Sequence, residues 1–237
     1  MATLDSFLPL VRGRLPGCPD IVLKDAVRDA AIEFCRRTEL LRANVDLAVV
    51  ANQSHYQLLR AVWGTWGEWL ATPEYEFITS DGGPYLTADG TAGLEGVVAW
   101  EVLQLRRTSQ CLTPANRQEF QLQGWDVATG APAYYYLDGD GTLVLGPIPD
   151  ASETLVATIS VTPGSSSTDI PEALWYDHRE TIAAGARAWV RRNLGDWVNP
   201  ELEAADRKVF EYAIHNQNIR RARGGANTAL RVRVQPF

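Results

Sequence analysis

The order in which hydrophobic patterns follow one another most constrains the fold of this chain. Apolar side chains recur at helical spacing in residues 19–42 and again after residue 170, whereas residues 45–162 are rich in β-branched and aromatic side chains. Because helical and strand patterns are segregated along the chain, they favour an α+β fold over a parallel α/β fold. We expect the N- and C-terminal helices to pack together as a helical bundle, with the β region inserted between them.

The N-terminal end is predicted to hold two helices. A short helix at about 3–14 is followed by LPGCP, whose two prolines and glycine interrupt it. A longer helix is predicted over residues 19–42, where apolar side chains are spaced to cover one helix face. These side chains are Leu23, Val27, Ala30 and Phe34.

The middle of the chain predicts an antiparallel sheet or a small sandwich. In residues 155–161 every second side chain is apolar, which is typical of a strand with one buried face. Turn sequences separate the strand-like runs, and DGDG at 138–141 predicts a hairpin between AYYYL and TLVLG.

Two further helices are predicted within residues 163–223, after the connector PGSSSTD. Asp169 is placed to cap the first of them, and Gly195 is placed to end it. The AAGA run at 183–186 removes side-chain bulk, so we expect another helix to approach closely there. Asn199, followed by a proline and a glutamate, is typical of the start of the last helix.

These patterns divide the chain into four parts. The N-terminal and C-terminal helices form one helical domain, the β domain between them carries an insertion at about 60–95, and an extended arm ends the chain. The predicted boundaries are 1–44, 45–162, 163–223 and 224–237.

The last 20 residues differ in charge from the rest of the chain. They contain five arginines and no acidic residue, so the first 217 residues carry a net charge of −12 within a total of −7. After Gly224 and Gly225, arginine and valine alternate in ALRVRVQPF as they would in a strand. A basic arm on an acidic protein suggests that the arm has a partner of its own. Arginine, which far outnumbers lysine here, suits interfaces, although a GC-rich genome gives the same bias.

The sequence indicates no active site, metal site or cofactor site, and we predict that the protein is not an enzyme. His55, His178 and His215 lie far apart, and the three cysteines, which we expect to be reduced and mostly buried, show no metal-ligand spacing. DGDGT at 138–142 fails the calcium-loop pattern, and phosphate-binding glycine loops are absent. No apolar run reaches the roughly 18 residues of a membrane span, so we expect no membrane partner.

The sequence WGTWGEW places Trp63, Trp66 and Trp69 within seven residues. Three interpretations remain open: a loop or hairpin packed on the sheet, a contact surface for another protein, or a platform for sugars. The neighbouring acidic residues disfavour nucleic acid, because binding through phosphates needs cations.

Several of these segments, taken in order, resemble one known family. They are AIEFCRRT at 31–38, GAPAYYYLDGDGTLVLGPIPD at 130–150 with the following TLVATISVTP, and IPEALWYDHRETIAAGARAWV, which an NP-started helix with F-E-Y and a basic end follow. Together they resemble the head-to-tail adaptor (connector) proteins of short-tailed bacteriophages, the tail tubular protein A-like family. The resemblance covers most of the chain except about 60–95, where some 35 residues are inserted after the YQL strand.

The resemblance implies a structural virion protein in the tail or neck, assembled in the host cytoplasm. Such adaptors form a homo-oligomeric ring, typically a dodecamer, between the portal protein and the tail nozzle protein. They extend the channel through which DNA passes without specific binding, and they have no catalytic residues and no cofactor. Their helices face the portal and neighbouring subunits, and their C-terminal segment latches the portal.

Applied to this chain, the resemblance makes the C-terminal arm a portal-binding element. Arg220, Arg221 and Arg223 would sit where the arm leaves the fold, and Phe237 would anchor its end. The arm would add a strand to a partner's sheet edge, with arginines on one face and valines on the other. The strand residues concerned are Arg231, Val232, Arg233 and Val234.

Other interpretations of the sequence remain open. The arm would otherwise be a solvated terminus or a contact with DNA in the channel. The inserted tryptophans are expected to contact the nozzle, fibres or a neighbouring subunit. As a whole, the chain would otherwise be a tail-associated glycan-binding module or a connector of long-tailed phages.

Overall fold

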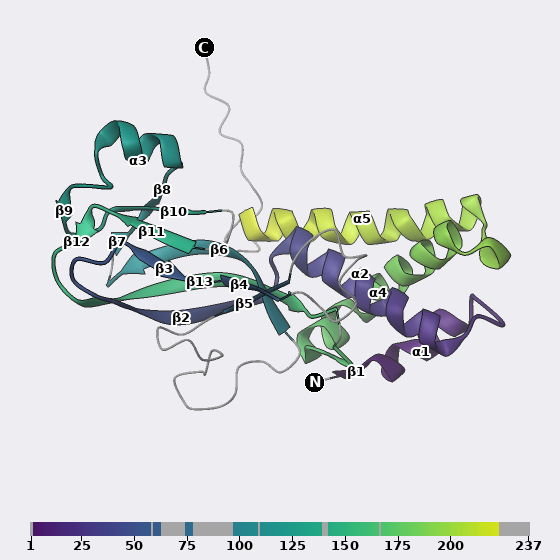
Figure 1. Ribbon diagram of the computed structural model, residues 1–237. Coiled ribbons are helices and arrows are strands. Elements are labelled where there is room, and N and C mark those ends of the chain that lie inside the picture. Colours follow the sequence, from purple (N-terminus) through teal and green to yellow (C-terminus); the bar gives the residue numbers. More distant parts are fainter. Residues whose placement is uncertain are drawn as a thin grey trace, which may run out of the picture.

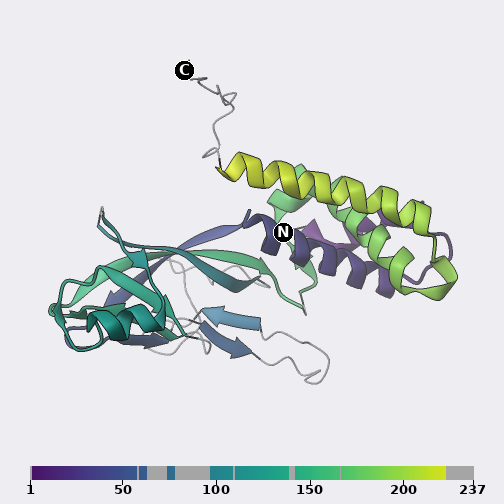
Figure 2. The same ribbon diagram turned by 90° about the horizontal axis from the view of Figure 1, so that it is seen from above.

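A computed structural model describes residues 2–57, 59–62, 74–77, 97–108, 110–138, 142–165 and 167–222. It contains a helical part and a β part that lie side by side along the length of the molecule (Figure 1). Seen from above, the helices from the two ends of the chain lie together, and the strands extend away from them (Figure 2). The predicted α+β fold is confirmed.

Four helices form the helical part. α4 packs against the other three, so helices from opposite ends of the chain share one hydrophobic core. The apolar face predicted for the longer N-terminal helix is buried in this core. The helices are α1 (Leu4–Arg12), α2 (Asp20–Thr38), α4 (Glu172–Asn193) and α5 (Pro200–Ala222), with a 3₁₀ turn (Gly195–Trp197) before α5.

The ends of α4 differ from the sequence prediction. Asp169 does not cap the helix, because it belongs to the short strand β14 (Asp169–Ile170), which pairs antiparallel with β1 (Ala2–Thr3). Gly195 does not end the helix in a left-handed conformation, since Leu194 leaves it in extended backbone at φ −114° and Gly195 begins the 3₁₀ turn. Asn199 does cap α5, because its Oδ1 accepts a 3.0 Å hydrogen bond from the backbone N–H of Leu202.

A six-stranded antiparallel sheet forms the larger layer of the β part. Its path is β2-β13-β6-β5-β4, and β7 pairs with β6 off this path. β4 and β5 lie within the predicted insertion and form an antiparallel pair at one edge. The strands are β2 (Arg42–Val49), β4 (Leu59–Val62), β5 (Glu74–Phe77), β6 (Val97–Arg107), β7 (Gln110–Cys111) and β13 (Glu153–Pro163).

A second sheet of order β3-β11-β10-β8 packs on the first. The predicted hairpin is confirmed, since β10 and β11 pair antiparallel, but the β10–β8 and β9–β12 pairs are parallel. The two larger sheets share one hydrophobic core, which favours the sandwich over a single sheet. The elements are β3 (His55–Gln57), β8 (Thr113–Pro114), α3 (Arg117–Gln123), β9 (Thr129–Gly130), β10 (Tyr134–Leu137), β11 (Thr142–Gly146) and β12 (Ile148–Pro149).

β13 connects the two parts of the molecule. Its residues Leu155, Ala157 and Ile159 are buried in the β core, as the alternation predicted. Toward its end, Ser160 and Thr162 are also fully buried, and α2 packs against this strand. The strand therefore contributes to the sheet and to the base of the helical part. The four domain boundaries given above remain predictions.

Candidate interaction surface of the helical part

α5 lies unusually close to α4 where the two helices cross. The side chain of Phe210 is fully buried against Gly185, which belongs to the AAGA run. A Cβ atom on Gly185 would lie 2.7 Å from the Phe210 ring and 3.1 Å from the Cβ of Ala30. The close approach predicted from the small residues is therefore confirmed, and it brings α2, α4 and α5 together at one point.

A buried ionic clamp fixes the first half of α5. Asp206 accepts hydrogen bonds from Arg187 Nε at 3.1 Å and Nη2 at 2.9 Å, and also from Arg191 Nη1. All three side chains are no more than 6% exposed. The two arginines lie one turn apart on α4, so one carboxylate holds both. Their remaining N–H groups donate to the backbone carbonyls of Leu10, Arg14 and Leu202.

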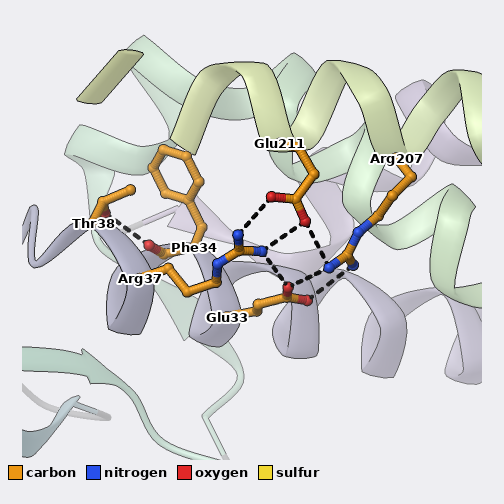
Figure 3. A network of polar contacts seen from close by, with 6 residues as sticks. All are labelled: Glu33, Phe34, Arg37, Thr38, Arg207 and Glu211. Carbon is orange, nitrogen blue, oxygen red and sulfur yellow. Dashed lines mark hydrogen bonds and ion pairs between the residues drawn. The ribbon is translucent and has the colours of Figure 1, made fainter. Parts of the chain in front are cut away.

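A second polar network joins the middle of α5 to α2 (Figure 3). Arg37 donates to both carboxylate oxygens of Glu211, at 2.7 and 2.5 Å, and to Glu33 at 3.0 Å. Arg207 donates to Glu33 at 3.0 Å and forms a 2.7 Å ion pair with Glu211. The hydrogen bond from Arg37 lowers the pKa of Glu211. These side chains are partly exposed, so the network fixes the alignment of the two helices more than it adds stability.

The last turn of α5 is attached to the junction between α2 and β2. Arg221 Nη1 lies 2.6 Å from Glu39 Oε1 and donates to the carbonyl of Thr38 at 3.4 Å. Glu39 ends α2 in a left-handed conformation, at φ 48° and ψ 37°. Arg221 thus satisfies a carbonyl at the end of α2, where such groups lack helical partners. The point from which the chain continues past α5 is fixed to the base of the β part.

His178 of α4 is buried beside this exit point. Its ring packs against Phe34, with 4.8 Å between the ring centroids, and Gln217 Nε2 lies 3.1 Å from His178 Nε2. Burial lowers the pKa of His178, and the positive charge of Arg220 acts in the same direction, whereas Asp177 opposes it. The imidazole is therefore held neutral, with a nitrogen free to accept from the amide.

The structure places two of the predicted arm residues. Arg220 and Arg221 lie in the last turn of α5, and Arg221 makes the contacts described above. The remaining predicted arm residues lie outside the described residues: Arg223, Arg231, Val232, Arg233, Val234 and Phe237. The tryptophans predicted to contact the tail or a neighbour lie outside them as well, in the segment between β4 and β5: Trp63, Trp66 and Trp69.

The clamp and the network were not predicted from the sequence. A signal for the network exists, since Glu33 and Arg37, and likewise Arg207 and Glu211, are oppositely charged pairs four residues apart. Two arginines within the otherwise apolar part of α4 could have indicated the clamp. Their acidic partner, Asp206, lies on another helix, and no local pattern assigns it to them.

The described residues contain no group of three or more His, Cys, Asp or Glu side chains placed to hold a metal ion. Within the same part of the chain, no helix is long and apolar enough to cross a membrane. Of the cysteines, Cys18 and Cys35 are buried and Cys111 is exposed. The arrangement joins helices and fixes an exit point, which suits a binding surface rather than a reaction centre.

Comparison with known proteins gives one family. No curated protein matches the chain. The SU10 adaptor protein family matches residues 2–234. This agrees with the adaptor resemblance, while the narrower assignment to the tail tubular protein A-like family remains a prediction. Since the match spans nearly the whole chain, this protein belongs to the SU10 adaptor protein family and is a structural adaptor of a phage virion, not an enzyme.

Proposed function

We propose that this adaptor forms a ring of twelve subunits in the neck of the virion, between the portal protein and the tail nozzle protein. The ring extends the DNA channel and joins the tail to the head, and it is assembled in the host cytoplasm. The observation that carries the proposal is the family match over residues 2–234, because it includes the helices, the sheets and most of the C-terminal arm.

The C-terminal arm is the portal latch in this proposal. Its starting point supports the role, because Arg221 is held by Glu39 and by the carbonyl of Thr38. An arm that starts from a fixed point loses less conformational freedom on binding than one attached to a loose helix end. Residues 223–237 would span up to roughly 50 Å if extended, at about 3.3 Å per residue. That reach is enough to contact a separate protein.

The segment between β4 and β5 is the second proposed contact. It carries Trp63, Trp66 and Trp69, and the two strands that border it lie at the edge of the six-stranded sheet. Tryptophans at a sheet edge suit a protein contact because they bury a large area at low entropic cost. The proposed partner is the nozzle protein or a neighbouring subunit. Replacement of all three by alanine should then block tail attachment, and intact tails on such particles would disprove this role.

Free passage of DNA is the third element of the proposal. The first 217 residues carry a net charge of −12, and a channel lined by such a surface would repel phosphates instead of binding them. We expect no retention of double-stranded DNA by the assembled protein at physiological salt in a filter-binding assay.

Co-sedimentation with the phage's own portal ring tests the proposal. The intact chain should sediment with the portal, and a chain cut after Gly225 should not, if the arm is the latch. Equal binding by both forms would show that the helices carry the docking and would remove this role from the arm. If neither form binds, the neck position itself is wrong.

A further inference from the structure

One side of α5 carries an exposed apolar surface. Leu202, Val209 and Tyr212 are 49%, 52% and 67% exposed, and Ala205 lies between them on the exposed side. At about 100° per residue, all four fall within one quarter of the helix circumference, on the side of α5 that faces away from α2. We call these four residues the apolar flank. Within the described part of the chain, nothing covers it.

The opposite side of α5 borders a groove of about 320 Å³. α4 supplies its floor with Gly185, Ala188 and Trp189, and the walls come from α2 and α5. Small floor residues leave room for an inserted side chain, and Trp189, which is 36% exposed, offers an apolar surface within the groove. The groove and the apolar flank thus lie on opposite sides of the same helix.

The two surfaces carry opposite charges at matching places. Asp29 lines the groove, is exposed, and makes no hydrogen bond or ion pair with other described residues. Lys208 borders the flank one turn before Tyr212 and is likewise exposed without an ion pair in the described part. An uncompensated acid at the groove and an uncompensated base at the flank are complementary.

We propose that the apolar flank of one copy docks into the groove of the next copy, with Lys208 paired to Asp29 across the contact. The proposal rests on the proposed function and names the surfaces that join neighbouring subunits in the ring. Two different patches on opposite sides of one molecule form a heterologous contact, and such contacts close into rings when the rotation between copies allows it. A self-complementary patch would stop at a dimer instead.

Cross-linking on the portal ring tests which surfaces meet. In a Cys111→Ser background, one sample carries Asp29→Cys and a second carries Lys208→Cys, and both are treated with a short bismaleimide. Cross-linked dimers are expected when the two variants are mixed on the portal ring and not in either variant alone. Rings without cross-links in the mixture, or dimers in a single-variant sample, would overturn the proposal while the proposed function stands.

Substitution of the flank gives a second test. Val209→Arg and Tyr212→Arg should each reduce the protein retained on portal rings at least tenfold, because a buried unpaired arginine opposes docking. Leu122→Arg is the matched control, since Leu122 is 83% exposed on α3 and undergoes the same type of change. Unchanged far-UV circular dichroism and melting would show that the variants fold. Normal retention of both flank variants would overturn the proposal, and failure of the wild-type chain to bind portal rings would overturn it together with the proposed function.

Discussion

Replacement of Asp206 by asparagine should destabilise the helical part more than any exposed charge change. Asp206 is 4% exposed and holds the guanidinium groups of Arg187 and Arg191, which are themselves buried. Asparagine keeps the size of the side chain but removes its charge and turns one acceptor into a donor that faces the arginines. Two buried cations would then share no anion within their shell except the distant contact of the network on the other side of α5.

The expected loss follows from the burial of the pair. Breaking a buried ion pair by removing one partner costs about 3–5 kcal/mol, because the remaining charge is left desolvated without compensation. Backbone carbonyls of Leu10, Arg14 and Leu202 continue to accept from the arginines, so we expect the lower half of that range. For a chain of this length, about 3 kcal/mol corresponds to a fall in Tm of roughly 10 °C.

Urea unfolding followed by far-UV circular dichroism would measure the effect. Glu203→Gln is the control, since Glu203 lies one turn earlier on α5 and is less buried than Asp206. Simultaneous replacement of Arg187, Asp206 and Arg191 by methionine, leucine and methionine should recover much of the loss, because no buried charge remains. A loss below about 1 kcal/mol for Asp206→Asn would refute the reasoning, because a loss that small is typical of exposed pairs.

Three further predictions concern stability. Gly185→Ala should lower the free energy of unfolding by up to about 2 kcal/mol, since overpacking costs about 1–3 and helix propensity returns about 1, whereas Gly195→Ala, which has open space around it, should not. The pKa of His178 is lowered in the folded state, so its neutral form adds stability above the unfolded pKa of about 6.5 that is lost as pH falls through the folded value; urea midpoints at about pH 7.5 and 5.5 should differ less in His178→Asn. The pKa of Glu211 is also lowered, so the stability difference between wild type and Glu211→Gln should shrink as pH falls below about 4.3, and a pH-independent difference would contradict this.

The sequence predicted elements better than their contacts. The helices, the β10–β11 hairpin and the buried face of β13 follow from periodicity and turn residues, because these depend on neighbours in the chain. Asp169 was misassigned as a cap because the sequence did not show that residues 2–3 would recruit it into a strand pair. The buried Ser160 likewise depends on α2 lying over the end of β13. Long-range pairing of this kind leaves no local pattern.

The candidate site shows the same limit. Arg220 and Arg221 were identified as the start of the arm from charge alone, and their place in the last turn of α5 agrees with that position. The residue that fixes Arg221 is Glu39, more than 180 positions away and in a left-handed conformation that favours glycine or asparagine. Neither its backbone geometry nor its partner could be read from the sequence, because both arise from how α2 turns into β2.

The polar contacts of α5 are spaced along its whole length. Asp206 holds its first half to α4, Arg207 and Glu211 hold its middle to α2, and Arg221 holds its last turn to the α2–β2 junction. At 1.5 Å per residue, its 23 residues span about 35 Å. A helix fixed at three levels moves as one rod with its neighbours. Force applied at its end is therefore transmitted to the base of the β part and to the buried clamp instead of unwinding the last turn, as an attachment point between two large assemblies requires.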